Sequence, residues 1–100
     1  MAATPESKVK KAIKAWLDRQ TAYYTMPIGT GFGAHGVPDF LCCINGRFVG
    51  IEAKAPGKRN NTTMLQDRNL EAIKTAGGIS IVVDDVSQLD AIIPHVRQSS

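Results

Sequence analysis

The sequence predicts an α/β fold in which a mixed β-sheet with a central hairpin is flanked by helices. Asn45-Gly46 separates two runs of β-branched and apolar residues, and this is the strongest short-range sign of a hairpin. Apolar residues recur at helical spacing over residues 5–20 and 63–76. A further run at 79–83 has strand composition. One hundred residues, 43% of them apolar, predict a single domain over 1–100.

The first helix begins with Thr4 as a plausible N-cap and Pro5 at the first helical position, and we expect it to run to about Gln20. Its buried stripe consists of Val9, Ile13, Trp16 and Leu17. The basic residues that lie off the stripe are Lys8, Lys11, Lys14 and Arg19. They favour a solvated face over a dedicated DNA contact, although one face can serve both. Glu6 falls on the stripe. From the helix alone, the favoured interpretation is an acidic residue in the first turn that complements the helix dipole.

The hairpin register brings two carboxylates together. A two-residue type I′ turn at Asn45-Gly46 pairs Ile44 with Arg47 and, counting outward, Asp39 with Glu52. Opposed carboxylates repel, and Lys54 shares the face of Glu52, so its ammonium joins the pair. An acidic pair of this kind suits Mg²⁺ or Mn²⁺. Taken singly, Asp39 reads as a turn residue and Glu52 with Lys54 as a weak exposed ion pair. The shared register favours a site.

Both faces of the hairpin strands are largely apolar, which predicts central strands covered on both sides. We expect a short strand over Tyr23–Met26, ended by Pro27, to pair with them. Cys42 and Cys43 point to opposite faces. Both read as small core residues in a reducing compartment, and a metal or disulfide role is less favoured.

A glycine-rich loop precedes the hairpin. Gly31, Gly33 and Gly36 form a G-x-G-x-x-G pattern, but a strand follows it and not a helix, which excludes a dinucleotide-binding motif. We expect a flexible loop beside the metal site, with backbone amides available to a phosphate. His35 lies four residues before Asp39, where it could touch substrate, although a lone loop histidine is more often simply exposed.

A basic loop follows Lys54. Its ordinary interpretation is a solvated connection, but its position makes phosphate contact by Lys58 and Arg59 the more useful hypothesis. Thr62-Thr63 then caps the second helix, which ends at Ala76. If Thr63 is the N-cap, Gln66 occupies the capping-box position, which is a complete structural explanation for this residue. The inward stripe of this helix comprises Leu65, Asn69, Leu70 and Ile73, with Gln66 inside the same arc.

The remaining chain predicts a buried strand at Ile79–Val83, a turn at Asp84 and Asp85, and a short last helix from Ser87. Pro94 should end or kink that helix. The tail from His95 onward is expected to fray.

Pro38-Asp39, a turn and then Glu52-Ala53-Lys54 resemble the signature of PD-(D/E)XK nucleases, and the flanking order resembles the VRR-NUC family. The resemblance spans roughly Pro5 to Leu89 and rests on Glu6-Ser7, Gly36-Val37-Pro38-Asp39, Ile51-Glu52-Ala53-Lys54, Gln66 and Gly77-Gly78. It implies a PD-(D/E)XK nuclease-like α/β core. Asp39, Glu52 and the carbonyl of Ala53 would bind Mg²⁺ or Mn²⁺. Lys54 would be the catalytic lysine, with Glu6 and Gln66 in support.

The function implied is hydrolysis of DNA phosphodiester bonds. Short standalone members of the family, typical of phages, resemble homodimeric resolvases, so we expect a homodimer that cuts Holliday (four-way) junctions or other branched DNA. One alternative is a less selective nicking or single-strand nuclease in phage replication. Another is a non-catalytic DNA-binding module. The formal charge of +3 and pI near 9.1 favour a polyanionic partner. No run is apolar enough to span a bilayer, which predicts a cytoplasmic protein, in the host cell if phage-encoded.

Overall fold

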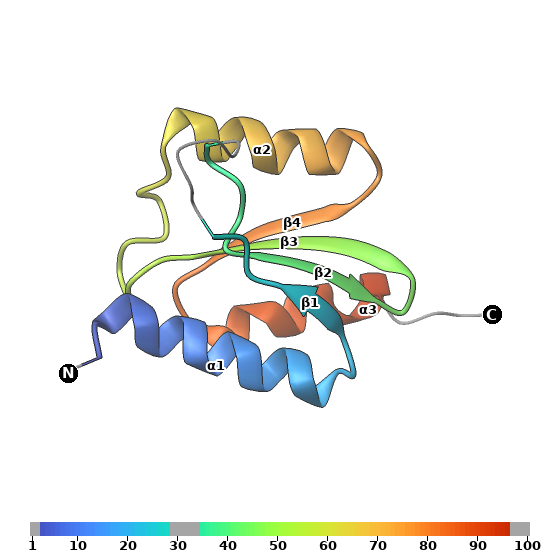
Figure 1. Cartoon of the computed structure of the whole chain (residues 1–100), viewed down its shortest axis with the longest axis horizontal. Helices are drawn as coiled ribbons and strands as arrows, with labels where there is room; N and C mark the ends of the chain where they lie inside the picture. The colour runs from blue at the N-terminus through green and yellow to red at the C-terminus, as the bar shows by residue number, and fades with distance from the viewer. Residues whose placement is uncertain (1–2, 29–34, 97–100) are drawn as a thin grey trace.

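The computed structural model describes residues 3–28 and 35–96. They form three layers, in which a four-stranded sheet lies between two layers of helices. The elements in chain order are α1 (Pro5–Arg19), β1 (Tyr23–Thr25), β2 (Phe40–Ile44), β3 (Arg47–Ala53), α2 (Met64–Thr75), β4 (Ile79–Val83), the 3₁₀-helix η1 (Val86–Ile92) and α3 (Ile93–Val96). Figure 1 shows α2 on one face of the sheet and α1, η1 and α3 on the other. The strand order is β1-β2-β3-β4, antiparallel except for the parallel pair β3–β4. The predicted mixed α/β class is confirmed.

The hairpin β2–β3 forms the centre of the sheet, in the predicted register. Asn45 and Gly46 have φ angles of 50° and 80°, as a type I′ turn requires. Pairing then runs without a bulge from Ile44 with Arg47 to Phe40 with Ile51. The predicted short strand is also present, since Tyr23 pairs with Cys43 and Thr25 with Leu41.

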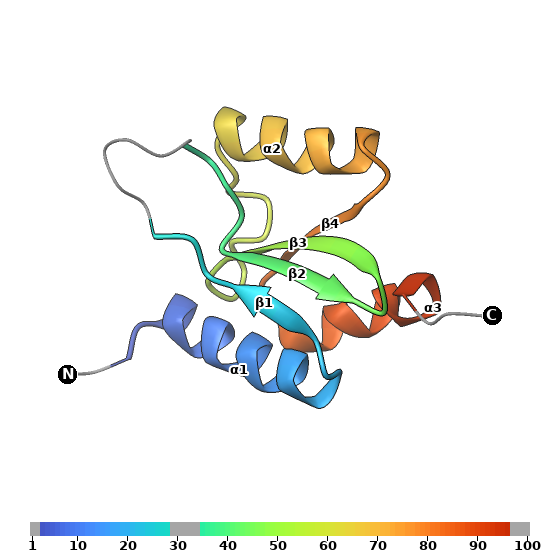
Figure 2. The same ribbon diagram turned by 45° about the vertical axis from the view of Figure 1, so that its right-hand side comes forward.

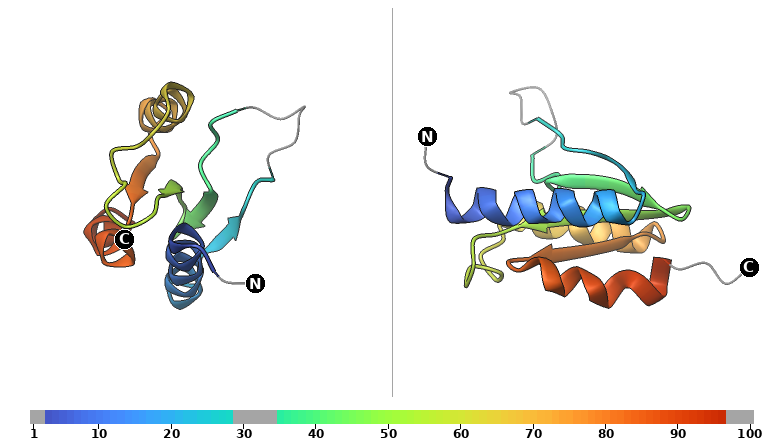
Figure 3. Two further views of the ribbon diagram at one scale, coloured as in Figure 1. Left: turned by 90° about the vertical axis from the view of Figure 1, so that its left-hand side faces the viewer. Right: turned by 90° about the horizontal axis from the view of Figure 1, so that it is seen from below.

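The main core lies between the sheet and the layer formed by α1, η1 and α3. The stripe predicted on α1 is buried there, together with the alternate residues Phe40, Cys42, Ile44, Val49, Ile51 and Ala53 of the hairpin. Figure 3 shows α1 and η1 side by side beneath the sheet. Trp16 of α1 joins them by donating from Nε1 to Oδ1 of Asp90 over 3.2 Å. Burial raises the pKa of the Cys42 thiol to about 12, so this cysteine is an inert core residue, as predicted.

The opposite face of the sheet is covered only in part, so the expectation of cover on both sides is wrong there. Helix α2 packs on β3 and β4, as Figure 2 shows. A Cβ added to Gly50 would lie 2.6 Å from Cδ1 of Ile73, which explains the glycine beneath the helix. Cys43 is nevertheless exposed, not buried as expected, and Phe48 is 46% exposed.

Fewer residues of α2 are buried than the apolar periodicity of its sequence predicted. Leu70 is buried, whereas Leu65 is 45% exposed. A single helix over the outer half of one sheet face buries fewer positions than a helix packed on both a sheet and a second helix. The caps themselves are as predicted. The Thr4 hydroxyl accepts from the Ser7 amide over 3.1 Å, and Thr63 and Gln66 form a complete capping box.

The C-terminal part differs from the single helix expected from Ser87. Residues 86–92 form η1, and α3 begins at Ile93, so Pro94 is the second residue of a new helix. A first turn tolerates proline because its N–H has no partner within the helix. Val96 is buried, which makes the expected fraying from His95 wrong for residues 95–96. Asp84 and Asp85 are turn residues as predicted, accepting from the amides of Gly57 and Ser87 over 2.9 Å each.

Candidate active site

The first part of the site is the predicted carboxylate pair. Asp39 immediately precedes β2, and its Oδ2 accepts a hydrogen bond from the Ala53 amide over 2.9 Å. This bond fixes the Asp39 carboxylate at the end of β3, beside Glu52. Glu52 is only 4% exposed, so it is not a member of a weak exposed ion pair. Burial and the neighbouring charge of Asp39 raise the pKa of Glu52 to about 7, against the opposing effect of Lys54.

Lys54 and Gln66 complete a connected network around Glu52. The ammonium of Lys54 lies 3.8 Å from Oε2 of Glu52 and donates to Oε1 of Gln66 over 3.0 Å. The amide nitrogen of Gln66 donates to the same Oε2 of Glu52 over 3.1 Å. Oε1 of Gln66 also accepts from the backbone amide of Thr63 over 3.0 Å. The capping box therefore fixes the orientation of the side chain that holds both Glu52 and Lys54.

A second lysine, Lys10, reaches the pair from α1. Its Nζ lies 3.4 Å from Oε2 of Glu6 and 3.5 Å from Oδ1 of Asp39. Burial lowers the pKa of Lys10, but the charges of Asp39 and Glu6 outweigh this and raise it overall. The sequence reasoning missed Lys10. Its spacing of four residues from Glu6 was the available signal, since such residues share one helix face.

The donor set fits a hard divalent cation. The described residues contain no group of three His, Cys, Asp or Glu side chains arranged to hold a metal ion. Mg²⁺, however, commonly takes one or two protein carboxylates and fills its other positions with water and substrate phosphate. Glu52 supplies a buried carboxylate and Asp39 a half-buried one, and the charge of Asp39 disfavours ionisation of Glu52. A cation there would offset both desolvation and repulsion.

Comparison with solved structures places this arrangement in a known fold. A chain described as "VRR_NUC domain" superposes with a TM-score of 0.70, covering 95% of this chain and 100% of its own length at 26% identity. A chain described as "VRR_NUC domain protein" has a TM-score of 0.72, covering 96% of this chain and 90% of its own at 18% identity, which supports the fold alone. No family model and no curated protein matches the sequence. The chain has the fold of VRR-NUC nuclease domains. The resemblance noted in its sequence is thereby confirmed.

The segment leading to Asp39 is docked on α2. Asn69 donates from Nδ2 to the carbonyl of His35 over 3.1 Å. Gly36 has a φ of 81°, and a Cβ there would lie 2.5 Å from the backbone carbon of Leu65. These two contacts place His35 and Gly36 beside the N-terminal half of α2, which also carries Gln66. His35 is exposed and Gly36 is half-buried. Gly31 and Gly33 of the glycine-rich motif lie outside the described residues.

The two residues expected to contact phosphate after Lys54 are both exposed. Arg59 turns to the outer side of β4, donating from Nε to the carbonyl of Val82 over 2.7 Å. This bond uses the Nε–H donor of the Arg59 guanidinium and covers part of the open edge of the sheet at β4. Among the described residues, no hydrogen bond or ion pair joins Lys58 or Arg59 to Asp39 or Glu52, so phosphate contact by these two residues stays a prediction.

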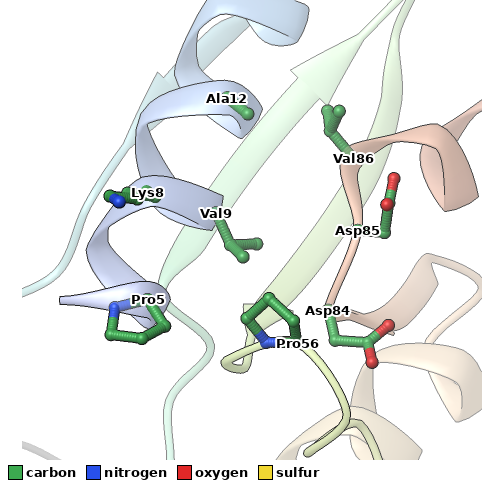
Figure 4. Close-up of a pocket in the computed structure, with 8 residues that line it drawn as sticks. All are labelled: Pro5, Lys8, Val9, Ala12, Pro56, Asp84, Asp85 and Val86. Carbon is green, nitrogen blue, oxygen red and sulfur yellow. The ribbon is translucent and has the colours of Figure 1, made fainter.

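The protein also has an apolar hollow of about 430 Å³ between α1 and the start of η1. Figure 4 shows Val9, Pro56 and Val86 around it. None of Asp39, Glu52, Lys54 or Gln66 lines this hollow. The candidate active site is therefore the connected polar network at the end of β3 and not this cavity.

None of the described helices is long and apolar enough to cross a membrane.

Proposed function

We propose that this VRR-NUC domain is a metal-dependent, structure-selective DNA endonuclease that resolves Holliday junctions as a homodimer. The observation that carries the proposal is the network joining Asp39, Glu52, Lys54 and Gln66, in which each side chain has a defined partner. A buried carboxylate with a neighbouring ammonium suits metal-assisted hydrolysis of a phosphodiester.

The proposed metal ligands are Asp39, Glu52 and the backbone carbonyl of Ala53, with Glu6 in support. A bound Mg²⁺ or Mn²⁺ would lower the pKa of a water molecule and offset charge on the phosphate. Lys54, positioned by Gln66, would donate a hydrogen bond to the attacking water or to a phosphate oxygen. Attack of water at phosphorus forms one P–O bond and breaks another, leaving one strand end with a phosphate and the other with a hydroxyl.

The preference for a four-way junction follows from symmetry. Such a junction needs two cuts, and a two-fold symmetric dimer presents two equivalent sites. The open part of the sheet offers a surface for the second copy. Tyr23, Cys43 and Phe48 are cross-strand neighbours on β1, β2 and β3, and all three are exposed. A continuous apolar row of this kind suits a self-complementary contact.

The decisive experiment compares cleavage of a labelled four-way junction with cleavage of flap, single-stranded and linear duplex DNA in Mg²⁺ or Mn²⁺. We expect paired cuts across the junction, and a loss of about 100-fold or more in Lys54→Ala. Lys74→Ala is the matched control, because Lys74 is an exposed lysine on the last turn of α2.

The same assay separates the competing functions. Metal-dependent cutting without junction preference would support a less selective nicking or single-strand nuclease. Binding without any cutting by a folded, metal-supplied protein would support a non-catalytic DNA-binding module. A monomer in light scattering that cuts linear duplex as fast as junctions would contradict the homodimeric resolvase.

A further inference from the structure

The positive charge of the chain is concentrated on one helix. α1 contains five of the twelve Lys and Arg residues and two of the nine Asp and Glu residues. Its formal charge of +3 therefore equals that of the whole chain, and the remaining residues are balanced. A charge excess confined to one helix is the electrostatic pattern expected of a surface that meets a polyanion.

The lysines of α1 line a groove. A hollow of about 790 Å³ extends along the helix, with Lys8, Lys10, Lys11 and Lys14 on it, together with Ser7 and Met26. Asp18 is the one acid among the residues that line it. That carboxylate faces Tyr24, whose pKa is raised by burial and by the charge and hydrogen bonding of Asp18. The other charged residues that line the groove are all lysines.

The groove begins at the candidate active site. Lys10 lines it and also lies 3.5 Å from Oδ1 of Asp39. Lys14 follows one turn later, about 6 Å along the helix axis. Lys11 and Lys14 are exposed, and no carboxylate of the described residues lies within ion-pair distance of either. Their ammonium groups are therefore available to an external anion.

We propose that this lysine groove binds the sugar–phosphate backbone of the DNA strand that flanks the scissile phosphate. The proposal rests on the proposed nuclease function and assigns the path of the substrate to α1. Lys11 and Lys14 contact successive parts of the backbone, whereas Lys10 holds the end nearest the carboxylates. Contacts of this kind are independent of base sequence, as a junction-selective enzyme requires.

The test is the salt dependence of DNA binding in EDTA, where metal-dependent cutting is halted. The variant is Lys11→Gln with Lys14→Gln. Its matched control is Arg68→Gln with Lys74→Gln, which removes the same charge from exposed positions on α2. The probes are a fluorescent four-way junction and a fluorescent linear duplex. Each lost phosphate contact lowers the slope of log K against log salt by about 0.9, so the groove variant should lose about 2.

We expect the groove variant to bind both probes roughly tenfold more weakly at physiological salt, and the control to bind as the unaltered protein does. In Mg²⁺, saturating protein should restore cutting by the groove variant, because its carboxylates and Lys54 are intact. If the unaltered protein cuts DNA but the two double variants bind it equally well and with equal salt slopes, the lysine groove is not the binding surface. An unaltered protein that neither binds nor cuts any DNA would overturn the nuclease function itself and the groove with it.

Discussion

The side chain of Gln66 donates from Nε2 to Oε2 of Glu52 over 3.1 Å. Its other end, Oε1, accepts from the Thr63 amide and from Nζ of Lys54, over 3.0 Å each. One amide therefore serves both the N-terminal cap of α2 and the hydrogen bonding of the candidate site. The orientation of the amide is fixed at both ends. If it were reversed, its oxygen would face the Glu52 carboxylate and its NH₂ group would face the Lys54 ammonium.

Gln66→Glu should separate these two roles. A glutamate at this position still accepts from the Thr63 amide, so the capping box and most of the thermal stability should persist. It cannot donate to Glu52, and it adds a negative charge beside it, so cleavage should fall by about tenfold or more. Thermal unfolding and single-turnover cleavage measure the two effects. Unchanged cleavage in Gln66→Glu would contradict a supporting role for the amide.

Lys10→Met should change how divalent cations affect stability. In the absence of metal, Lys10 is the countercharge of both Asp39 and Glu6, so its removal should lower the melting temperature in EDTA. The same removal leaves the carboxylates more attractive to a cation. The rise in melting temperature on adding Mg²⁺ or Mn²⁺ should therefore be larger than in the unaltered protein.

Lys74→Met is the control for Lys10→Met, because it removes an exposed charge on α2. It should show the same response to metal as the unaltered protein. A metal response that is equal in Lys10→Met and Lys74→Met would contradict placement of the cation beside Lys10.

The stability of the metal-free protein should depend on pH through Glu52. The pKa of this carboxyl is about 7 in the folded protein and near 4.5 ordinarily, so folding favours the protonated form. Its contribution to the free energy of unfolding is complete below about pH 4.5 and is lost as the pH rises through 7. Urea unfolding in EDTA between pH 5 and about 8 should show this loss. Glu52→Gln should flatten the dependence, and an unchanged profile in that variant would assign the effect to other groups.

Gly36→Ala should weaken the attachment of the Asp39 segment to α2. The residue has a φ of 81°, and a Cβ would lie 2.5 Å from the backbone of Leu65. Strain and collision together should cost about 1–3 kcal/mol in the free energy of unfolding. Gly57→Ala is the matched control, because Gly57 has a φ of 82° but no atom within 4 Å of an added Cβ. Equal losses in urea unfolding would show that only the φ angle matters and that docking does not.

Local signals in the sequence predicted most of the secondary structure and the first site residues. The turn at Asn45-Gly46 has a two-residue loop, so counting outward from it places Asp39 near Glu52. Because side chains alternate along a strand, Lys54 lies on the same face as Glu52. The Thr63–Gln66 capping box is equally local. These predictions succeeded because the forces that determine them act over a few residues.

The covering of the sheet was decided by tertiary packing. Cys43 has apolar neighbours in sequence, yet it is exposed because it lies on β2, whereas α2 packs on β3 and β4. Phe48 lies on β3 beside α2 and is still 46% exposed. Sequence alternation identifies which side chains share a face, but it does not say how far a helix extends over that face. The same reason explains the exposure of Leu65 on α2.

By itself the sequence determined the hairpin register, the helix caps and the proximity of Asp39, Glu52 and Lys54, because turns, caps and strand alternation are short-range. Only the tertiary structure decided that Glu52 is buried, that Gln66 joins it to Lys54, and that Lys10 pairs with Asp39. Those contacts join elements that are far apart in sequence. They depend on the angle and distance at which α1 and α2 dock on the sheet, which the sum of many core contacts determines.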